Sequence, residues 1–335
     1  MQISALRERL GAALLDFAWS QWSQMGMLAA TGRRDDWAQD PEALIVFSLE
    51  IGRNDPRLFD ELLGWLVVNG DLVSRQRLTN LCPATDRTRR VVEAALAWAS
   101  EHGARLRPLS PPGEARTEPL FPSITRVTDP DDAFLTYGFA KPRADGRMRS
   151  SPPDRSLPVN FAFRLRDLLG MSTRAEIVRF LLTSRAHDST VLTVAEAASY
   201  AKRNVAEALG QLARSDFVTA FWIGNEGRYG IDADRWAQLL EIEPSGLPIY
   251  RPWPSLLTAV REVWTWARDP VLDELSDYLL ASRARELMDS VRPRLSASGV
   301  RLADKGAGAE YWGSFVETVE SALGELEARQ VSDGS

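Results

Sequence analysis

Apolar residues between positions 202 and 214 recur at intervals of three and four, which is the spacing of one face of an α-helix. These apolar positions are Val205, Ala208, Leu209 and Leu212. A shorter segment just before it repeats the pattern with Val194, Ala197 and Ala198. Thr193 is a suitable N-cap for this first segment, and Glu196 three residues later completes a capping box. The pattern predicts two short helices that meet at a tight turn.

A further helix is predicted before this pair, over residues 173–183. Ser172 is placed to cap it, and its apolar side consists of Ile177, Phe180 and Leu181. We expect this side to pack on the two helices that follow.

A β-hairpin is predicted after the pair. Residues 217–223 and 228–231 are rich in β-branched and aromatic residues, and they flank a turn at 224–227 that begins and ends with glycine. We expect Phe217 and Val218 to close the small core behind the hairpin.

Three helices followed by a hairpin is the layout of a winged helix-turn-helix, and residues 172–232 resemble the winged helix-turn-helix transcription regulators of the MarR and ArsR type. The positions that match core residues of that family are Ala198, Val205, Leu209, Leu212, Phe217 and Val218. The resemblance implies a double-stranded DNA partner. It also implies that the residues turned toward DNA are Lys202, Arg203, Asn204, Ala206 and Glu207.

The residues themselves favour the same surface. Two cations and an amide at the start of a helix suit entry into a major groove, and Gln211 lies on the same side. Asn225 and Arg228 in the hairpin are placed to meet a phosphate or a minor groove. A winged helix also serves as a docking unit for proteins, so the alternative is a non-catalytic interaction module, such as an adaptor or an antitoxin-like component.

Three positions depart from the family pattern. Ala201 stands where the usual helix cap is Ser, and Asp216 stands where Gly usually follows the recognition helix. Asp tolerates the left-handed backbone, so we expect the fold to be kept. Glu207 is an anion where many relatives carry a cation. It can accept a hydrogen bond from cytosine, or it can weaken phosphate binding.

Charge is spread unevenly along the 335 residues, whose net charge is −6. Residues 141–166 hold seven basic residues against Asp145 and Asp154: Lys141, Arg143, Arg147, Arg149, Arg155, Arg164 and Arg166. This segment is either an arm that follows phosphates or a solvated linker. Residues 237–335 hold ten cations and sixteen anions, so we expect no DNA contact there.

Proline marks the domain boundaries, because ten of the nineteen prolines fall between residues 108 and 158. The expected fold is mainly α, with a central winged helix-turn-helix and one β-hairpin between helical domains. The expected parts are a helical bundle (1–104), a Pro-rich basic linker (105–170), the winged helix-turn-helix (171–243) and a helical C-terminal domain (244–335).

The N-terminal part reads as helices throughout. Asp40-Pro41 and Asp55-Pro56 are helix starts, and Ser74 opens a short helix. The helices around 56–81 form either a plain bundle or a second, degenerate helix-turn-helix with Arg75 and Arg77 exposed.

The C-terminal helices are predicted at 255–268, 270–291 and 309–329. The last has an apolar stripe that needs a partner face: Trp312, Phe315, Val316, Val319, Leu323 and Leu326. This stripe forms either a homodimer, as in MarR-like proteins, or a contact with the N-terminal helices. Aromatic residues in this region either belong to the core or line an effector pocket: Tyr250, Trp264, Trp266 and Trp312.

Other function classes lack their signatures. No apolar run approaches 18 residues and no signal-peptide pattern is present, so we expect a cytoplasmic protein with no membrane partner. Cys82 is the single cysteine, and His102 and His187 are far apart, so no metal or other cofactor is expected. No phosphate loop, nucleophile elbow or paired-histidine motif is present, and we expect no catalysis.

Overall fold

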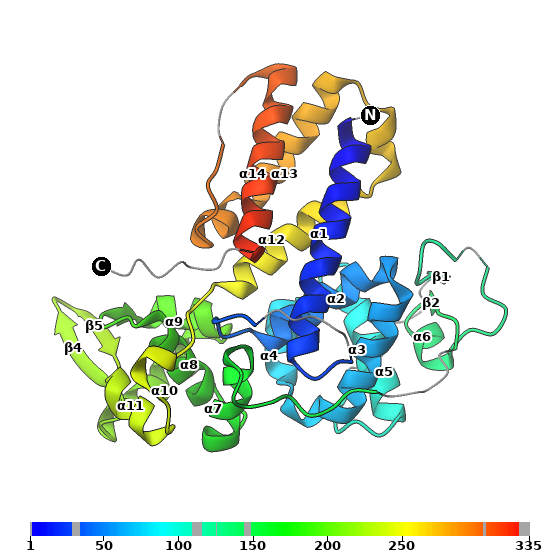
Figure 1. The fold of residues 1–335 in the computed structure, drawn as a ribbon. Helices are drawn as coiled ribbons and strands as arrows, with labels where there is room; N and C mark the ends of the chain where they lie inside the picture. The colour runs from blue at the N-terminus through cyan, green and yellow to red at the C-terminus, as the bar shows by residue number, and fades with distance from the viewer. Residues whose placement is uncertain are drawn as a thin grey trace.

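The computed structural model describes residues 2–28, 34–108, 116–124, 126–143, 149–303 and 306–327. It is mainly helical with two small sheets (Figure 1), which confirms the expected mainly α class. The first half of the chain contains α1 (Gln2–Gln24), α2 (Pro41–Ile51), α3 (Pro56–Asn69), α4 (Arg75–Leu81), α5 (Arg89–Glu101), β1 (Glu118–Pro119), α6 (Asp132–Thr136), β2 (Phe139–Ala140) and α7 (Phe161–Leu169).

The second half begins with α8 (Thr173–Ser184), β3 (Ser189–Thr190), α9 (Val191–Ala198), α10 (Lys202–Arg214), β4 (Thr219–Ile223), β5 (Glu226–Gly230) and α11 (Ala233–Leu239). It continues with α12 (Trp253–Ala267), α13 (Asp277–Ala297) and α14 (Tyr311–Glu327). β1 and β2 form a parallel pair, and the second sheet has the order β3-β5-β4 with antiparallel neighbours.

Local signals in the N-terminal part act as expected. Asp40 caps α2 by accepting a hydrogen bond from the Ala43 N–H, with a proline at the first helical position. Asp55 caps α3 in the same way, and Ser74 caps α4. These three predicted helix starts are confirmed.

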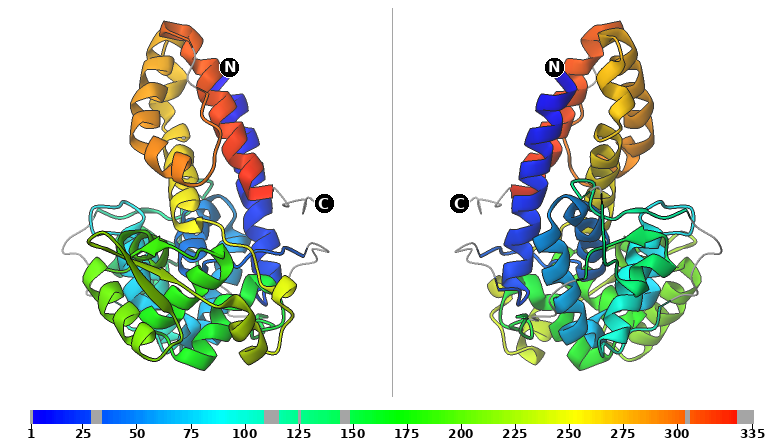
Figure 2. Two further views of the ribbon diagram at one scale, coloured as in Figure 1. Left: turned by 90° about the vertical axis from the view of Figure 1, so that its left-hand side faces the viewer. Right: turned by 90° about the vertical axis from the view of Figure 1, so that its right-hand side faces the viewer.

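One hydrophobic core joins the early and late helices of the chain. Helices α1 to α5 and the segments around β1, α6 and β2 share it with α12, α13 and α14. Figure 2 shows α1 and α14 running side by side, with α12 and α13 next to them, as a projection from the rest of the molecule. The residues that α1 buries there include Leu6, Leu10, Leu14 and Phe17.

A second core lies in residues 161–250, which we call the central unit. It contains α7 to α11 and the three-stranded sheet, and Ala38 contributes to its core. Its helices follow in the predicted order, and β4 and β5 form the predicted hairpin. The hairpin turns at Gly224 and Asn225, where Gly224 takes the positive φ of 59° that glycine accepts without strain.

These two cores differ from the four parts expected from the sequence. The segment expected to be a linker is packed: Leu120, Phe121, Phe134 and Phe139 are buried in the first core, and Phe161 and Leu165 in the central unit. Its aromatic residues supply enough apolar area to hold it against its neighbours.

The apolar face of α14 is covered within the chain. Trp312, Phe315, Val319 and Leu326 are buried in the first core, where α14 contacts α1, α12 and α13. The C-terminal helices therefore follow the intrachain alternative, and this stripe is not free to form a dimer.

Three smaller expectations are corrected. Helix α9 begins at Val191, because Thr190 and not Thr193 supplies the capping oxygen, which accepts from the Thr193 N–H at 3.1 Å. Ser172 precedes α8 but makes no capping hydrogen bond. Phe217 is 38% exposed, so Val218 fills the core at this point without it.

Six buried charged residues join the central unit to the first core, and we call them the ion cluster. They are Asp40, Glu42, Arg77, Arg166, Glu176 and Arg179. Asp40 and Glu42 lie at the start of α2, Arg77 on α4, and the other three on α7 and α8. The cluster contains three cations and three anions, so its formal charge is zero.

Each member of the ion cluster has at least two partners of opposite charge. Arg166 contacts Glu42 at 2.8 Å and Glu176 at 2.6 Å, and Arg179 contacts Asp40 at 2.8 Å and Glu176 at 2.9 Å. Arg77 pairs with Asp40 and Glu42 and is wholly buried. The alternative of a second, degenerate helix-turn-helix with Arg77 exposed is therefore wrong, because this side chain is the centre of an internal contact.

Burial and pairing act on the carboxyl groups in opposite directions. Burial alone would raise the pKa of Asp40, but Arg77 and Arg179 outweigh it and the pKa is lowered. Burial likewise opposes ionisation of Glu176, and Arg166, Arg77 and Arg179 hold its pKa far below the usual value. The carboxylates are thus ionised in the folded protein.

Removing one partner from the ion cluster should be costly. We expect Arg77→Met to lower the free energy of unfolding by about 3–5 kcal/mol, because it leaves a buried negative charge without compensation. Urea unfolding followed by circular dichroism at pH 7 measures this. Arg283→Met, in an exposed pair with Glu286, is the control and should change stability by less than about 0.5 kcal/mol. Equal effects in the two variants would contradict the role of the cluster.

Acid should weaken the same contact. The ordinary pKa values of Asp40 and Glu176 are 3.8 and 4.5, and both are lowered on folding. The stabilisation is therefore complete above about pH 5 and is lost as the pH falls below it, at up to about 1.4 kcal/mol per pH unit for each group. Urea midpoints between pH 7 and pH 3 should show a shallower pH dependence in Glu176→Gln than in the wild type or in Glu286→Gln. The same slope in all three proteins would exclude Glu176 as a source.

Candidate nucleic-acid interface

Helix α10 is held by its apolar side and presents its polar side to solvent. Val205, Leu209 and Leu212 are buried against the rest of the central unit. The predicted DNA-facing residues of its first turns are all exposed, and we call them the outer face of α10: Lys202, Arg203, Asn204, Ala206 and Glu207. The structure therefore brings these five residues together on one accessible helix surface.

The start of α10 is suited to an anion. Ala201 is the N-cap and offers no side-chain acceptor to the free N–H groups of the first turn. Within the described parts of the chain, Lys202 and Arg203 form no ion pair. Uncapped N–H groups and two cations at a helix N-terminus together favour a phosphate oxygen.

Gln211 is less accessible than expected. It is half-buried, its amide donates to Glu207 at 3.5 Å, and its carbonyl accepts from Arg174. Arg174, an exposed residue of α8, was missed in the sequence because it precedes α10 by a whole helix. It adds a cation on the side of α10 where Glu207 places an anion.

Of the two hairpin residues predicted to contact DNA, one is exposed and the other is bound within the chain. Asn225 is exposed in the β4–β5 turn. Arg228 donates to the Asp188 carbonyl at 3.1 Å and pairs with Glu226 at 2.8 Å. Arg228 is therefore bound within its own sheet, and a phosphate would have to compete with Glu226 for it.

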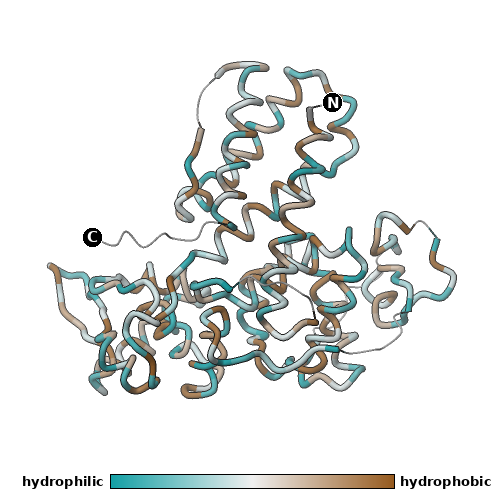
Figure 3. Tube along the Cα trace, viewed as in Figure 1, coloured by the Kyte–Doolittle hydropathy of each residue, from teal (hydrophilic) through white to brown (hydrophobic). Residues whose placement is uncertain are grey.

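Strand β4 is exposed along its whole length, and it is the edge strand of its sheet. Phe221, Trp222 and Ile223 are 42, 63 and 56% exposed. This hairpin lies at the edge of the molecule, far from α3 and α5 (Figure 1), and hydrophobic colouring reaches its tip in Figure 3. An exposed edge strand with three large apolar residues is a surface on which another chain can pair.

The turn between α9 and α10 is fixed from outside the central unit. Arg77 donates from Nε to the Ala198 carbonyl at 3.0 Å, and Asn80 donates to the Ser199 carbonyl at 2.8 Å. Ser199 has a φ of 56°, so the chain turns there in the left-handed conformation. Sequence reasoning missed this clamp because α4 is more than 115 residues away from the turn.

The seven basic residues of 141–166 do not form a free arm. Five are bound within the chain: Lys141 to Asp60, Arg143 to Asp129 and Asp132, Arg155 to Asp167, Arg164 to the Leu240 carbonyl, and Arg166 within the ion cluster. Arg149 is exposed, and Arg147 lies outside the described residues. Both alternatives, a basic arm and a solvated linker, are therefore corrected, because most of this charge serves internal pairing.

Charge on the central unit is balanced. Residues 172–232 contain seven cations and seven anions. Asp216, the residue that replaces the usual glycine, has a φ of 57°, so the expected left-handed cap is confirmed. The stretch 172–232 therefore has no net formal charge.

Other kinds of site receive little support from the described residues. They contain no group of three metal-ligating side chains of the His, Cys, Asp and Glu types, and none of their helices is long and apolar enough to cross a membrane. Burial, together with the Asp86 charge, raises the pKa of Cys82 to about 12, so this thiol stays protonated at neutral pH. Trp264 and Trp312 belong to the first core, while Trp266 and Tyr250 line different cavities.

Comparisons with known proteins do not extend this description: the chain matches no family model, no curated protein and no solved structure.

Proposed function

We propose that the protein is a sequence-specific DNA-binding regulator of transcription, and that α8 to β5 form a winged helix-turn-helix of the MarR or ArsR type. In this proposal α10 is the recognition helix and the β4–β5 hairpin is the wing. The observation that carries the proposal is the outer face of α10: two unpaired cations and an amide on the exposed side of a helix whose other side is buried.

The contacts follow from the chemistry of these side chains. Arg203 can donate two hydrogen bonds to a guanine, and Asn204 can pair with an adenine in the major groove. Lys202 and the first-turn N–H groups can bind a phosphate that fixes the helix in register. Asn225 extends the surface to the wing.

A homodimer is part of the proposal, since a two-fold dimer presents two recognition helices to successive turns of DNA. Because α12 to α14 pack within the chain, the two-fold contact would use a different surface. The proposed function also requires the cytoplasmic location expected from the sequence.

The double variant Lys202→Ala/Arg203→Ala tests the assigned helix. Fragmented genomic DNA is captured by the purified protein and sequenced, and the most enriched fragment is titrated at two salt concentrations. We expect the double variant to weaken binding by about 2–5 kcal/mol and to reduce the dependence on salt, because two base or phosphate contacts are lost.

Arg283→Ala is the matched control, since this arginine is exposed on α13 and far along the chain from α10. It should bind like the wild type. A double variant that binds as tightly as the wild type, or a protein that enriches no fragment even at low salt, would refute α10 as a recognition helix.

A second function is favoured by β4: a non-catalytic protein-interaction module. The edge of β4 away from β5 forms no ladder with another described strand. An extended segment of a partner protein can add to such an edge, with Phe221, Trp222 and Ile223 covering its side chains. We propose a strand of a different protein as the partner of this edge.

Trp222→Lys tests this second function. We expect nuclease-treated lysate to yield a stoichiometric complex with the wild type and with Leu279→Lys, an equally drastic change at a 50% exposed residue of α13, but not with Trp222→Lys. Light scattering on the purified proteins tests whether the strand that pairs with β4 comes instead from a second copy of this chain. A dimer that Trp222→Lys converts to a monomer would mean that β4 pairs with a second copy, and equal recovery with all three proteins would exclude β4.

A further inference from the structure

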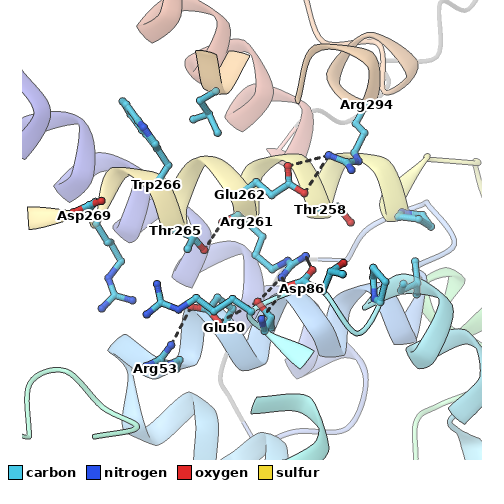
Figure 4. Close-up of a pocket in the computed structure, with 18 of the residues that line it drawn as sticks. Glu50, Arg53, Asp86, Thr258, Arg261, Glu262, Thr265, Trp266, Asp269 and Arg294 are labelled. Carbon is cyan, nitrogen blue, oxygen red and sulfur yellow. Dashed lines mark hydrogen bonds and ion pairs between the residues drawn. The ribbon is translucent and has the colours of Figure 1, made fainter. Parts of the chain in front are cut away.

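A large cleft lies beside the end of α4, between the N-terminal helices and α12. Its volume is about 1140 Å³, which is ample for a small molecule. Figure 4 shows α12 crossing it, with the Glu262–Arg294 pair on one side of the helix and Glu50, Arg53 and Asp86 on the other. Neither of the functions proposed above uses this cleft.

Most carboxylates of the cleft are already neutralised. Asp86 pairs with Arg261 at 2.6 Å, Glu262 with Arg294 at 2.9 Å, and Glu118 with Arg90 at 3.3 Å. Glu50 and Arg53 are also paired, at 3.5 Å. The fifth carboxylate of the lining, Asp269, accepts a hydrogen bond from the Val271 N–H and forms no ion pair in the described parts of the chain.

Arg87 and Arg268 are two further cations of the cleft. Neither has a carboxylate within ion-pair distance in the described parts of the chain, although both line the cleft. The Arg268 guanidinium lies over the Trp264 ring, 5.6 Å from its centroid. Burial lowers the pKa of Arg268, and the nearby charges of Arg53 and Arg87 lower it further, against the opposing charge of Glu50. Positive charge is therefore concentrated in one part of the cleft at an energetic cost that a bound anion would remove.

We propose that this cleft binds a small molecule that carries a phosphate group, with Arg87 and Arg268 as its main ligands and Arg53 beside them. Several guanidinium groups with free N–H donors suit the oxygens and the double charge of a phosphate. Threonine hydroxyls and the Trp266 ring on α12 line the rest of the cleft and can receive the remainder of the molecule.

The position of the cleft gives the ligand a regulatory role, and this part of the inference rests on the proposed DNA-binding function. Asn80 lines the cleft and also donates to the Ser199 carbonyl in the turn before α10. A ligand beside Asn80 would therefore act on the clamp that orients α10. The protein would then be a regulator whose DNA affinity responds to a phosphorylated metabolite.

Isothermal titration with inorganic pyrophosphate at constant ionic strength tests the site. We expect one site with a dissociation constant below about 1 mM in the wild type. Affinity should fall at least tenfold in Arg87→Gln/Arg268→Gln and stay unchanged in Arg283→Gln. Unfolding curves confirm that the double variant is folded, which is expected because neither arginine holds another element by an ion pair. No saturable binding, or equal binding by all three proteins, would overturn the site.

Hydrogen exchange tests the coupling without using DNA. Pyrophosphate should change the exchange of amides in residues 199–203 of the wild type but not of Arg87→Gln/Arg268→Gln. Binding without this change would refute the regulatory role and leave the phosphate site standing. Failure of the protein to bind DNA would refute the proposed function and leave both of these measurements valid.

Discussion

The arrangement of the molecule depends on the ion cluster between the first core and the central unit. Three arginines and three carboxylates are removed from water together. The attraction between opposite charges offsets part of the free energy that their desolvation costs. If the first core and the central unit packed in a different relative position, several of these charges would be buried without a partner in an interior of low polarisability. The cluster therefore selects one docking position, whereas apolar surfaces alone would tolerate several. The orientation of α10 relative to the rest of the chain follows from this choice, because Arg77 also holds the turn before that helix.

What the sequence predicts well is local. The stripe of Val205, Leu209 and Leu212 has the period of a helix, and Asp40 and Asp55 carry the chemistry of helix starts, so these elements are recognisable without knowledge of the fold. The hairpin is readable for the same reason, because its turn needs Gly224. The exposed outer face of α10 follows once the buried side of the helix is known.

What the sequence does not predict depends on distant partners. Arg166 lies 124 residues from Glu42, so a count of charges over 141–166 reads it as part of a free basic arm. The sequence around Arg77 gives no sign that this arginine is buried, and only the fold places it against Asp40. The clamp of Asn80 on Ser199 and the grouping of Arg87 with Arg268 likewise join residues with no shared local pattern. The sequence also misplaces Phe217, which packs on Trp236 but stays 38% exposed outside the core.

The discontinuous first core has a consequence for synthesis of the chain. The central unit is contiguous, so it can form as soon as residue 250 has left the ribosome, and the ion cluster can close at the same stage. Leu6, Leu10 and Leu14 are made well before the surfaces that cover them on α12 and α14. The growing chain therefore carries an uncovered apolar helix until α12 and α14 have been made. Exposed apolar surface of this kind favours chaperone binding and aggregation, so the risk falls on the nascent chain more than on the finished protein.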